Sequence, residues 1–178
     1  DSYKELLFAS RNDNNFVVVK NLLKKVHKKG GKIFFVGNGA SASLASHAAT
    51  DLTKQGKIRS LAFNDHNLIT ALSNDYGYEN WVSKALSYYS SPGDLLVLIS
   101  VSGESENLLK GLSYAKENGM KTISFTGFGE SNSLKTGSDI SLWVNSKSYN
   151  IVESIHTVWI TLIIDLIVGK SEYSVNSP

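Results

Sequence analysis

A short apolar run, followed at once by a glycine turn and a helix-compatible segment, constrains this chain most. Residues 33–36 read IFFV, which has the length and composition of a buried strand. Gly37 and Gly39 interrupt the run, because glycine turns sharply and lets a ligand approach the backbone. Small residues compatible with a helix follow from Ser41. This order is typical of an anion site in an α/β fold, because free N–H groups and the helix dipole face the turn.

A second loop of the same kind follows the apolar run at residues 95–99, which is typical of a strand buried on both faces. Residues 100–107 read SVSGESEN and lead into a segment with apolar residues at helical spacing. Neither loop contains lysine or arginine, so hydroxyls, backbone N–H groups and helix dipoles would have to hold a phosphate there. For one loop, helix capping by serine is the better interpretation. Two such loops at equivalent strand ends favour a phosphate site.

Strand and helix patterns alternate about five times along the chain. The expected strands are residues 33–36, 60–63, 95–99, 122–125 and 140–144. The expected helices are residues 1–29, 41–55, 65–72, 81–89, 108–118, 131–135 and 150–168, with residues 74–78 as a loop. Regular alternation predicts a parallel sheet with helices on both faces. In such sheets ligands bind at the carboxyl ends of the strands, where both loops are expected to lie.

Length and charge limit the domain count and the partners. The chain has 178 residues, which suits one domain with a full core. We expect N-terminal helices over residues 1–30, an α/β core with the last helix over residues 31–170, and a tail over residues 171–178. The net charge of +2 is too small to indicate nucleic acid or an acidic membrane. The apolar stretch at residues 158–168 is too short to span a bilayer and contains Asp165, so we expect no membrane partner.

Other features exclude particular kinds of chemistry. The chain contains no cysteine, which excludes disulfides and thiolate catalysis and fits the reducing cytoplasm. The glycine turn lacks the third glycine of the dinucleotide fingerprint, and no lysine follows its last glycine as in a Walker loop. We therefore expect a cytoplasmic protein without a nucleotide cofactor.

Two pairs of ionisable residues are candidates for catalysis or metal binding. His47 and Asp51 lie one turn apart on the helix after the glycine turn, so they share a face. Their spacing fits a metal-ligand pair, an acid with its partner, or a surface hydrogen bond equally well. Glu153 and His156 lie one turn apart on the last helix. Glu153 lies on the same helix face as apolar residues, which indicates a partly buried carboxylate with a functional role. Alternatively, a carboxylate near a helix start simply complements the helix dipole. Asp75 and Tyr78 are each either a substrate contact or a turn former.

Four ordered motifs carry a resemblance to a known family that covers nearly the whole chain. They are GNGAS at residues 37–41 with His47 and Asp51 after it, NDYGY at residues 74–78, ISVSGESEN at residues 99–107, and ESIH at residues 153–156. In this order and at these intervals they resemble the sugar isomerase (SIS) domain superfamily and, within it, the phosphoheptose isomerase family.

The resemblance implies a three-layer fold with a five-stranded parallel sheet, helices on both faces and an N-terminal helical extension. It also implies a homotetramer, with an active site shared between subunits where the last helix meets the helix from Ser41. The family isomerises a phosphorylated sugar, sedoheptulose 7-phosphate, through an enediol. The residues expected around the substrate are Asn38, Gly39, Ala40, Ser41, Asp75, Ser100, Val101, Ser102 and Ser105, of which the four serines contact the phosphate.

The family commonly binds zinc through a histidine and a glutamate after the glycine turn, and a glutamine and a histidine on the last helix. These positions map onto His47, Asp51, Glu153 and Thr161. Asp51 is shorter than the glutamate of the family, and Thr161 can neither titrate near neutral pH nor bind zinc as imidazole does. We therefore expect His47, Asp51 and Glu153 to form a zinc site that is weak or absent.

Some positions match the family motifs and others differ from them, so two functions from different classes remain open. The first is an isomerase acting on sedoheptulose 7-phosphate, with Asp51 and Glu153 as the catalytic carboxylates that carry the proton. The second is a non-catalytic phosphosugar-binding or protein-binding member of the family. Thr161 motivates it, together with Asn150, which stands where the family usually has aspartate. A further departure is Val101 in the serine-rich loop, where the family has threonine. In both cases we expect a homo-oligomer.

Overall fold

The structure is a computed structural model and describes residues 2–9 and 14–172. Asp1, residues 10–13 of the expected first helix and residues 173–178 of the expected tail lie outside the described residues. At the centre is a parallel sheet of five strands in the order β2-β1-β3-β4-β5. The strands are β1 (Ile33–Gly37), β2 (Ser60–Ala62), β3 (Leu95–Ser100), β4 (Lys121–Thr126) and β5 (Ile140–Trp143). The five expected strands and their parallel arrangement are thus confirmed.

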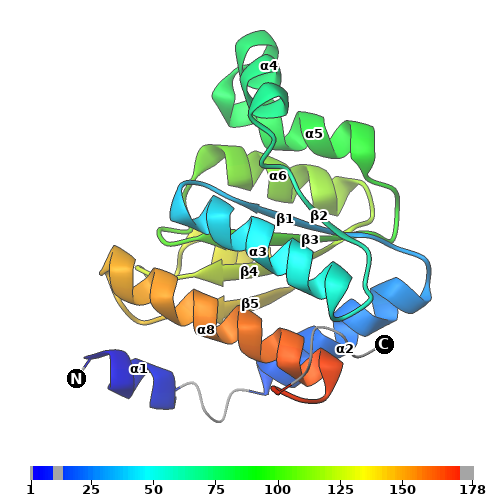
Figure 1. Cartoon of the computed structure of the whole chain (residues 1–178). Helices are drawn as coiled ribbons and strands as arrows, with labels where there is room; N and C mark the ends of the chain where they lie inside the picture. The colour runs from blue at the N-terminus through cyan, green and yellow to red at the C-terminus, as the bar shows by residue number, and fades with distance from the viewer. Residues whose placement is uncertain (1, 10–13, 173–178) are drawn as a thin grey trace.

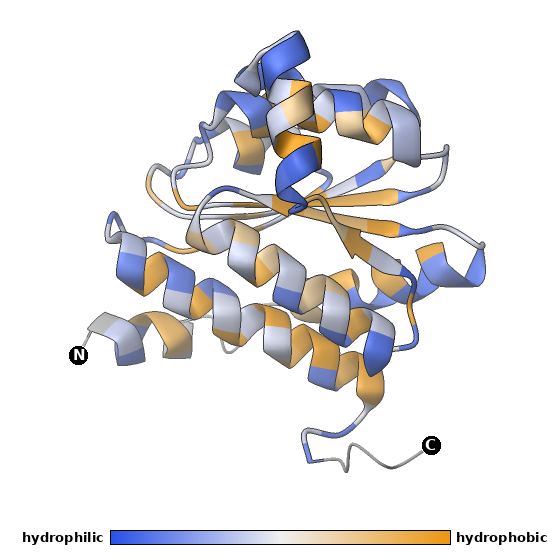
Figure 2. Ribbon diagram, turned by 45° about the horizontal axis from the view of Figure 1, so that its top comes forward, coloured by the Kyte–Doolittle hydropathy of each residue, from blue (hydrophilic) through white to orange (hydrophobic). Residues whose placement is uncertain are grey.

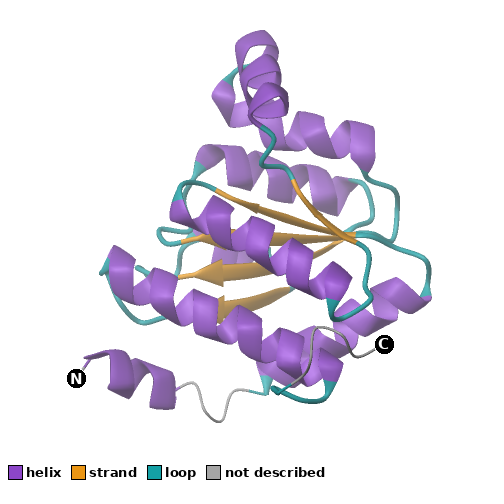
Figure 3. Cartoon of the chain, in the orientation of Figure 1, coloured by secondary structure: helices purple, strands orange, loops and turns teal. Residues whose placement is uncertain are grey.

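Helices connect the strands and cover the sheet on both faces (Figure 1; Figure 3). They are α1 (Ser2–Ala9), α2 (Asn15–Lys28), α3 (Ala40–Lys54), α4 (His66–Tyr76), α5 (Trp81–Tyr89), α6 (Glu106–Glu117), α7 (Ser133–Gly137) and α8 (Tyr149–Val168), with a 3-10 turn η2 (Tyr78–Asn80). Helices α2, α3 and α8 lie on one face, and α5 and α6 lie on the other. The expected three-layer fold is therefore confirmed.

Successive side chains of the central strands point to opposite faces, so the sheet contributes to two separate cores. Phe35 and Val97 face the α2–α3–α8 layer, whereas Phe34 and Leu96 face the α5–α6 layer. Figure 2 shows hydrophobic residues along the strands, while the helices carry both hydrophobic and hydrophilic residues. This explains the continuous apolar runs in the sequence, because a strand covered on both faces needs apolar residues at every position.

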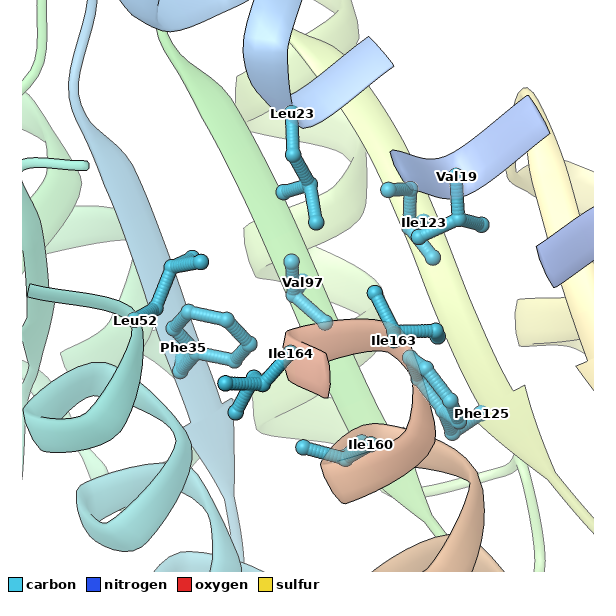
Figure 4. A pocket seen from close by; sticks show the side chains of 10 residues that line it. All are labelled: Val19, Leu23, Phe35, Leu52, Val97, Ile123, Phe125, Ile160, Ile163 and Ile164. Atoms are coloured by element: carbon cyan, nitrogen blue, oxygen red, sulfur yellow. The ribbon is translucent and has the colours of Figure 1, made fainter. Parts of the chain in front are cut away.

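Helix α8 supplies much of the first core and is also the one described helix long and apolar enough to cross a membrane by length and composition. Eight of its residues are buried against the rest of the chain, as expected of a core helix. Figure 4 shows it closing a small cavity whose lining side chains are all apolar: Val19, Leu23, Phe35, Leu52, Val97, Ile123, Phe125, Ile160, Ile163 and Ile164. A cavity without polar groups cannot orient a phosphorylated sugar, so the functional site lies elsewhere.

The N-terminal segment contains two helices, α1 and α2. One expectation about the helices was wrong. Helix α4 continues to Tyr76, so Asn74 and Asp75 lie in its last turn and not in a loop. Its start was predicted correctly, since the Asp65 side chain accepts a hydrogen bond from the Leu68 N–H. The helix ends at Gly77, whose φ of 87° is readily adopted only by glycine.

Candidate functional site

An open pocket of about 580 Å³ lies at the carboxyl ends of β1 and β3. It is lined by Asn38, Gly39, Ala40, Ser41, Ile99, Ser100, Val101, Ser102, Ser105, Tyr149 and Glu153. These residues come from the glycine turn (residues 37–39) with the start of α3, from the serine loop (residues 100–105), and from the start of α8. The chain leaves β1 toward β2 on one side and returns to β3 on the other. The pocket therefore occupies the topological switch point, where parallel sheets bind ligands.

The glycine turn brings the backbone to the pocket in a conformation that other residues would disturb. A Cβ atom at Gly37 would lie 2.6 Å from the carbonyl carbon of Ser41, so the strand can pass under the start of α3 only without a side chain. Gly39 has φ 57° and ψ −126° and precedes the first residue of α3. Only glycine adopts this conformation without strain. The turn thus delivers the positive end of the α3 dipole to the pocket.

The serine loop combines structural and ligand-facing roles. The Ser100 Oγ accepts a hydrogen bond from the Gly103 N–H at 3.1 Å, and the Ser102 Oγ accepts one from the Glu104 N–H at 3.2 Å. Each of these hydroxyls still has its own hydrogen to donate. Ser105 is the N-cap residue of α6, yet its side chain makes no capping hydrogen bond. Capping therefore does not account for Ser105, and the loop presents hydroxyl donors to the pocket.

Helix α8 adds a carboxylate and an aromatic ring to the pocket. Glu153 is partly buried and is the one carboxylate among the described residues that line the pocket, none of which carries a positive charge. Tyr149 lines the pocket one helical turn earlier, and its ring meets that of Phe128 edge to face at 5.3 Å. Tyr149 was not predicted from the sequence, although its position four residues before Glu153 places both side chains on one face of the helix.

Three expected site residues lie outside the pocket of a single chain. His47 and Asp51 sit on α3, where the His47 Nε2 and an Asp51 carboxylate oxygen are 3.0 Å apart. The His47 side chain is 57% exposed and that of Asp51 is 21% exposed, so the pair lies at the surface of the chain with His47 outermost. Asp75 is exposed at the end of α4 and accepts a hydrogen bond from the Asn74 side chain.

The expected zinc ligands do not form a site within one chain. Among the described residues, no three histidine, cysteine, aspartate or glutamate side chains are grouped as a metal would require. Glu153 lies in the pocket, whereas His47 and Asp51 bond to each other on α3. The Thr161 hydroxyl donates back to carbonyl groups of its own helix. The donor set of a single chain therefore does not fit the ion.

His156 is buried beside the site and does not line it. Its Nε2 lies 3.1 Å from the Thr126 carbonyl oxygen at the end of β4. Burial lowers the pKa of the His156 imidazole to about 4, although the hydrogen bond to Thr126 opposes this effect. The ring is therefore neutral near pH 7 and anchors α8 to the sheet.

A side-chain network that the sequence did not reveal holds the glycine turn in place. The Asn38 side chain exchanges two hydrogen bonds with Asn107 and accepts a third from the Tyr78 hydroxyl. These residues belong to three segments far apart in the sequence. The fold and the pocket together define a parallel α/β protein with an open pocket at the switch point of the sheet, the architecture of sugar isomerase domains.

Comparisons with known proteins identify the family within this class. A family model described as SIS domain matches residues 7–127. A phosphoheptose isomerase from Akkermansia muciniphila is 35% identical over 146 residues, which cover 79% of this chain and 77% of that protein. One from Helicobacter pylori is 38% identical over 143 residues, which cover 77% and 74%. This chain belongs to the phosphoheptose isomerase family of SIS-domain proteins.

Solved structures agree with this assignment. The structure of phosphoheptose isomerase GmhA from Neisseria gonorrhoeae matches with a TM-score of 0.86 at 28% identity. The match covers 94% of this chain and 91% of that one. The fold of the family therefore extends over nearly the whole chain.

Proposed function

We propose that this protein is a ketose/aldose isomerase that acts on a phosphorylated seven-carbon ketose, sedoheptulose 7-phosphate. The observation that carries the proposal is the pocket, in which the starts of two helices and the serine loop face Glu153. The helix starts and hydroxyls suit a phosphate group without any cation. The relatives in Akkermansia and Helicobacter, both named phosphoheptose isomerase, support the choice of sugar.

Glu153 is the proposed proton carrier within the pocket. Isomerisation removes a proton from C1 of the ketose, forms an enediol, and returns a proton to C2 while the carbonyl moves to C1. A positioned carboxylate can carry this proton between neighbouring carbons. Asp51 is the second proposed carboxylate, and it would reach the sugar from the α3 helix of a neighbouring subunit. His47 would orient it, since the two side chains already bond at 3.0 Å.

We also propose that the protein is a cytoplasmic homotetramer. Val158, Leu162 and Leu166 follow one another at four-residue spacing on α8 and are 45%, 40% and 37% exposed. Such a stripe on a helix whose other face is already buried needs a further apolar partner. Helix α3, which carries His47 and Asp51, packs beside α8 (Figure 1). Pairing of these faces between subunits would bring Asp51 to a second chain.

Zinc is proposed to bind weakly or not at all, because Thr161 offers no imidazole where the family has one and Asp51 is shorter than the glutamate of the family. The proposed chemistry therefore uses the carboxylates alone.

The test is aldose formation from sedoheptulose 7-phosphate by the purified protein, with and without added zinc. Turnover above background supports the isomerase, and none under either condition overturns it. A second function, phosphosugar binding without catalysis, is favoured by Thr161 and Asn150. It predicts that the sugar phosphate raises the melting temperature while turnover stays absent.

A further inference from the structure

Asn107 is buried next to the pocket without lining it. It lies in the first turn of α6, and only 2% of its surface is exposed. Its side chain pairs with that of Asn38, 69 residues earlier in the chain. The Asn107 Nδ2 donates to the Asn38 Oδ1 at 2.9 Å, and the Asn38 Nδ2 donates to the Asn107 Oδ1 at 3.0 Å. This reciprocal pair joins the glycine turn to the helix that follows the serine loop.

The Tyr78 hydroxyl completes the network by donating to the Asn38 Oδ1 at 3.1 Å. An amide oxygen has two lone pairs, so the protein itself occupies both acceptor positions of Asn38. Only one N–H of its side-chain amide remains for a ligand. The side chain of Asn38 therefore mainly stabilises the turn. The sequence predicted a different role, in which Asn38 contacts the substrate.

Backbone hydrogen bonds join the turn to the start of α3, since the carbonyl groups of Asn38 and Gly39 accept from the N–H groups of Ser41 and Ala42, whereas the Asn38 side chain joins it to α6. Apart from its chain neighbours, no described atom lies within 4 Å of the position that a Cβ of Gly39 would occupy, so side-chain packing does not fix Gly39 there. Glycine also has the widest choice of backbone conformations. Phosphate binding by N–H groups requires donors at fixed distances, because hydrogen bonds weaken quickly with length and angle. A turn that moves relative to the serine loop would lose part of the donor set.

We propose that Asn107 is a positioning residue that locks the glycine turn onto the serine loop, so that both present donors to one phosphate group. The proposal rests on the proposed function, because it assumes that the pocket binds a phosphorylated ligand. Asn107 acts through Asn38 and does not touch the ligand. Tyr78, which follows α4, stabilises the Asn38–Asn107 pair through its hydrogen bond to Asn38.

The test measures binding of inorganic phosphate, by NMR titration or calorimetry, to wild type and to Asn107→Ala, Asn38→Ala and the double variant. Loss of the paired amide should weaken phosphate binding about tenfold. Because Asn107 acts through Asn38, the change Asn107→Ala should cost less than about twofold when Asn38 is already alanine. Asn118→Ala is the matched control. Asn118 is the C-cap of the same helix and its side chain donates to the Tyr114 carbonyl, so phosphate affinity should stay unchanged.

Each result decides a separate question. Wild type that does not bind phosphate at the pocket overturns the proposed function, and this inference with it. If wild type binds phosphate and Asn107→Ala leaves the affinity unchanged, the positioning role alone is overturned. The same holds if Asn107→Ala weakens binding equally in wild type and in Asn38→Ala. If Asn107→Ala does not fold by circular dichroism, Tyr78→Phe carries the test. It removes one exposed hydroxyl, and should weaken binding about threefold in wild type and not at all in Asn38→Ala.

Discussion

The Nε2 of His156 donates a hydrogen bond to the carbonyl oxygen of Thr126 at a fully buried contact between α8 and β4. A carbonyl can only accept, so the proton of the neutral ring sits on Nε2. The Nδ1 has no partner among the described residues, and the rings of Phe125 and Trp159 lie nearby. Burial lowers the pKa of His156 to about 4, and the hydrogen bond to Thr126 opposes this shift only in part.

This contact predicts a loss of stability in mild acid. Between pH 6.5 and about 4 the unfolded chain binds a proton at His156 and the folded chain does not. Unfolding therefore takes up a proton, and the free energy of unfolding falls as pH decreases. From pH 8 to pH 5 we expect this group to cost about 2 kcal/mol.

Urea unfolding at several pH values measures the effect in wild type and in His156→Gln, which keeps a donor but cannot titrate. The variant should lose less stability over the same range. Equal pH dependence in the two proteins would contradict the prediction.

Glu153→Gln should abolish turnover while leaving ligand binding intact. The change keeps the size of the side chain but removes the group proposed to carry the proton, so kcat should fall at least about 100-fold with little change in KM. Glu117→Gln is the control, since Glu117 lies at the far end of α6 and bonds only to Ser113. Steady-state kinetics with sedoheptulose 7-phosphate measure both. A Glu153→Gln enzyme of normal kcat would exclude this role.

Tyr149→Ala should reduce the preference for a long sugar. The ring of Tyr149 lines the pocket and is steadied by Phe128, so it offers a flat apolar surface to the carbon chain of the ligand. We expect the ratio of kcat/KM for seven-carbon over five-carbon ketose phosphates to fall severalfold, within the range typical of apolar contacts. Tyr149→Phe keeps the ring and should keep the ratio. An unchanged ratio in Tyr149→Ala would show that the ring does not contact the sugar.

Thr161→His should strengthen zinc binding, because it restores an imidazole on α8 where the family has one. After dialysis against chelator, metal analysis should find little zinc in wild type and more in the variant. Adding His47→Ala to Thr161→His should remove it again. Stoichiometric zinc that survives chelator in wild type would refute the expectation of a weak site.

Leu162→Lys should lower the molar mass in solution. Leu162 is at the centre of the exposed stripe on α8, and a charge there opposes burial in an interface. Multi-angle light scattering at micromolar concentration gives the mass. Tyr88→Lys is the control, since Tyr88 is an exposed aromatic residue on α5, on the other face of the sheet. A monomeric wild type would rule out the subunit pairing proposed for Asp51.

The elements that the sequence predicted are those with local signals. The glycine turn and the run at β3 were predicted correctly, because a strand buried on both faces is apolar throughout and glycine marks the break. The end of α4 was predicted too early, since Asn74 and Asp75 favour turns in general, and only the position of Gly77 determines where the helix stops.

Non-local relationships could not be predicted in the same way. The pairing of Asn38 with Asn107 depends on the register of β1 against β3, which no local pattern encodes. The separation of Glu153 from Asp51 within one chain likewise depends on how α8 crosses α3. The sequence pattern placed these carboxylates on helix faces without giving the distance between the helices.

The adjacency of β1 and β3 has a consequence for how the chain acquires its binding capacity. The two halves of the pocket are far apart in sequence, with Asn38 and Asn107 separated by 69 residues. Contacts of such long range form only after a costly loop closure, so the centre of the sheet must assemble before the pocket exists. Affinity for phosphate should then emerge together with the final native signal during refolding. A stopped-flow experiment that detects binding in an earlier phase would show that the pocket forms before the sheet.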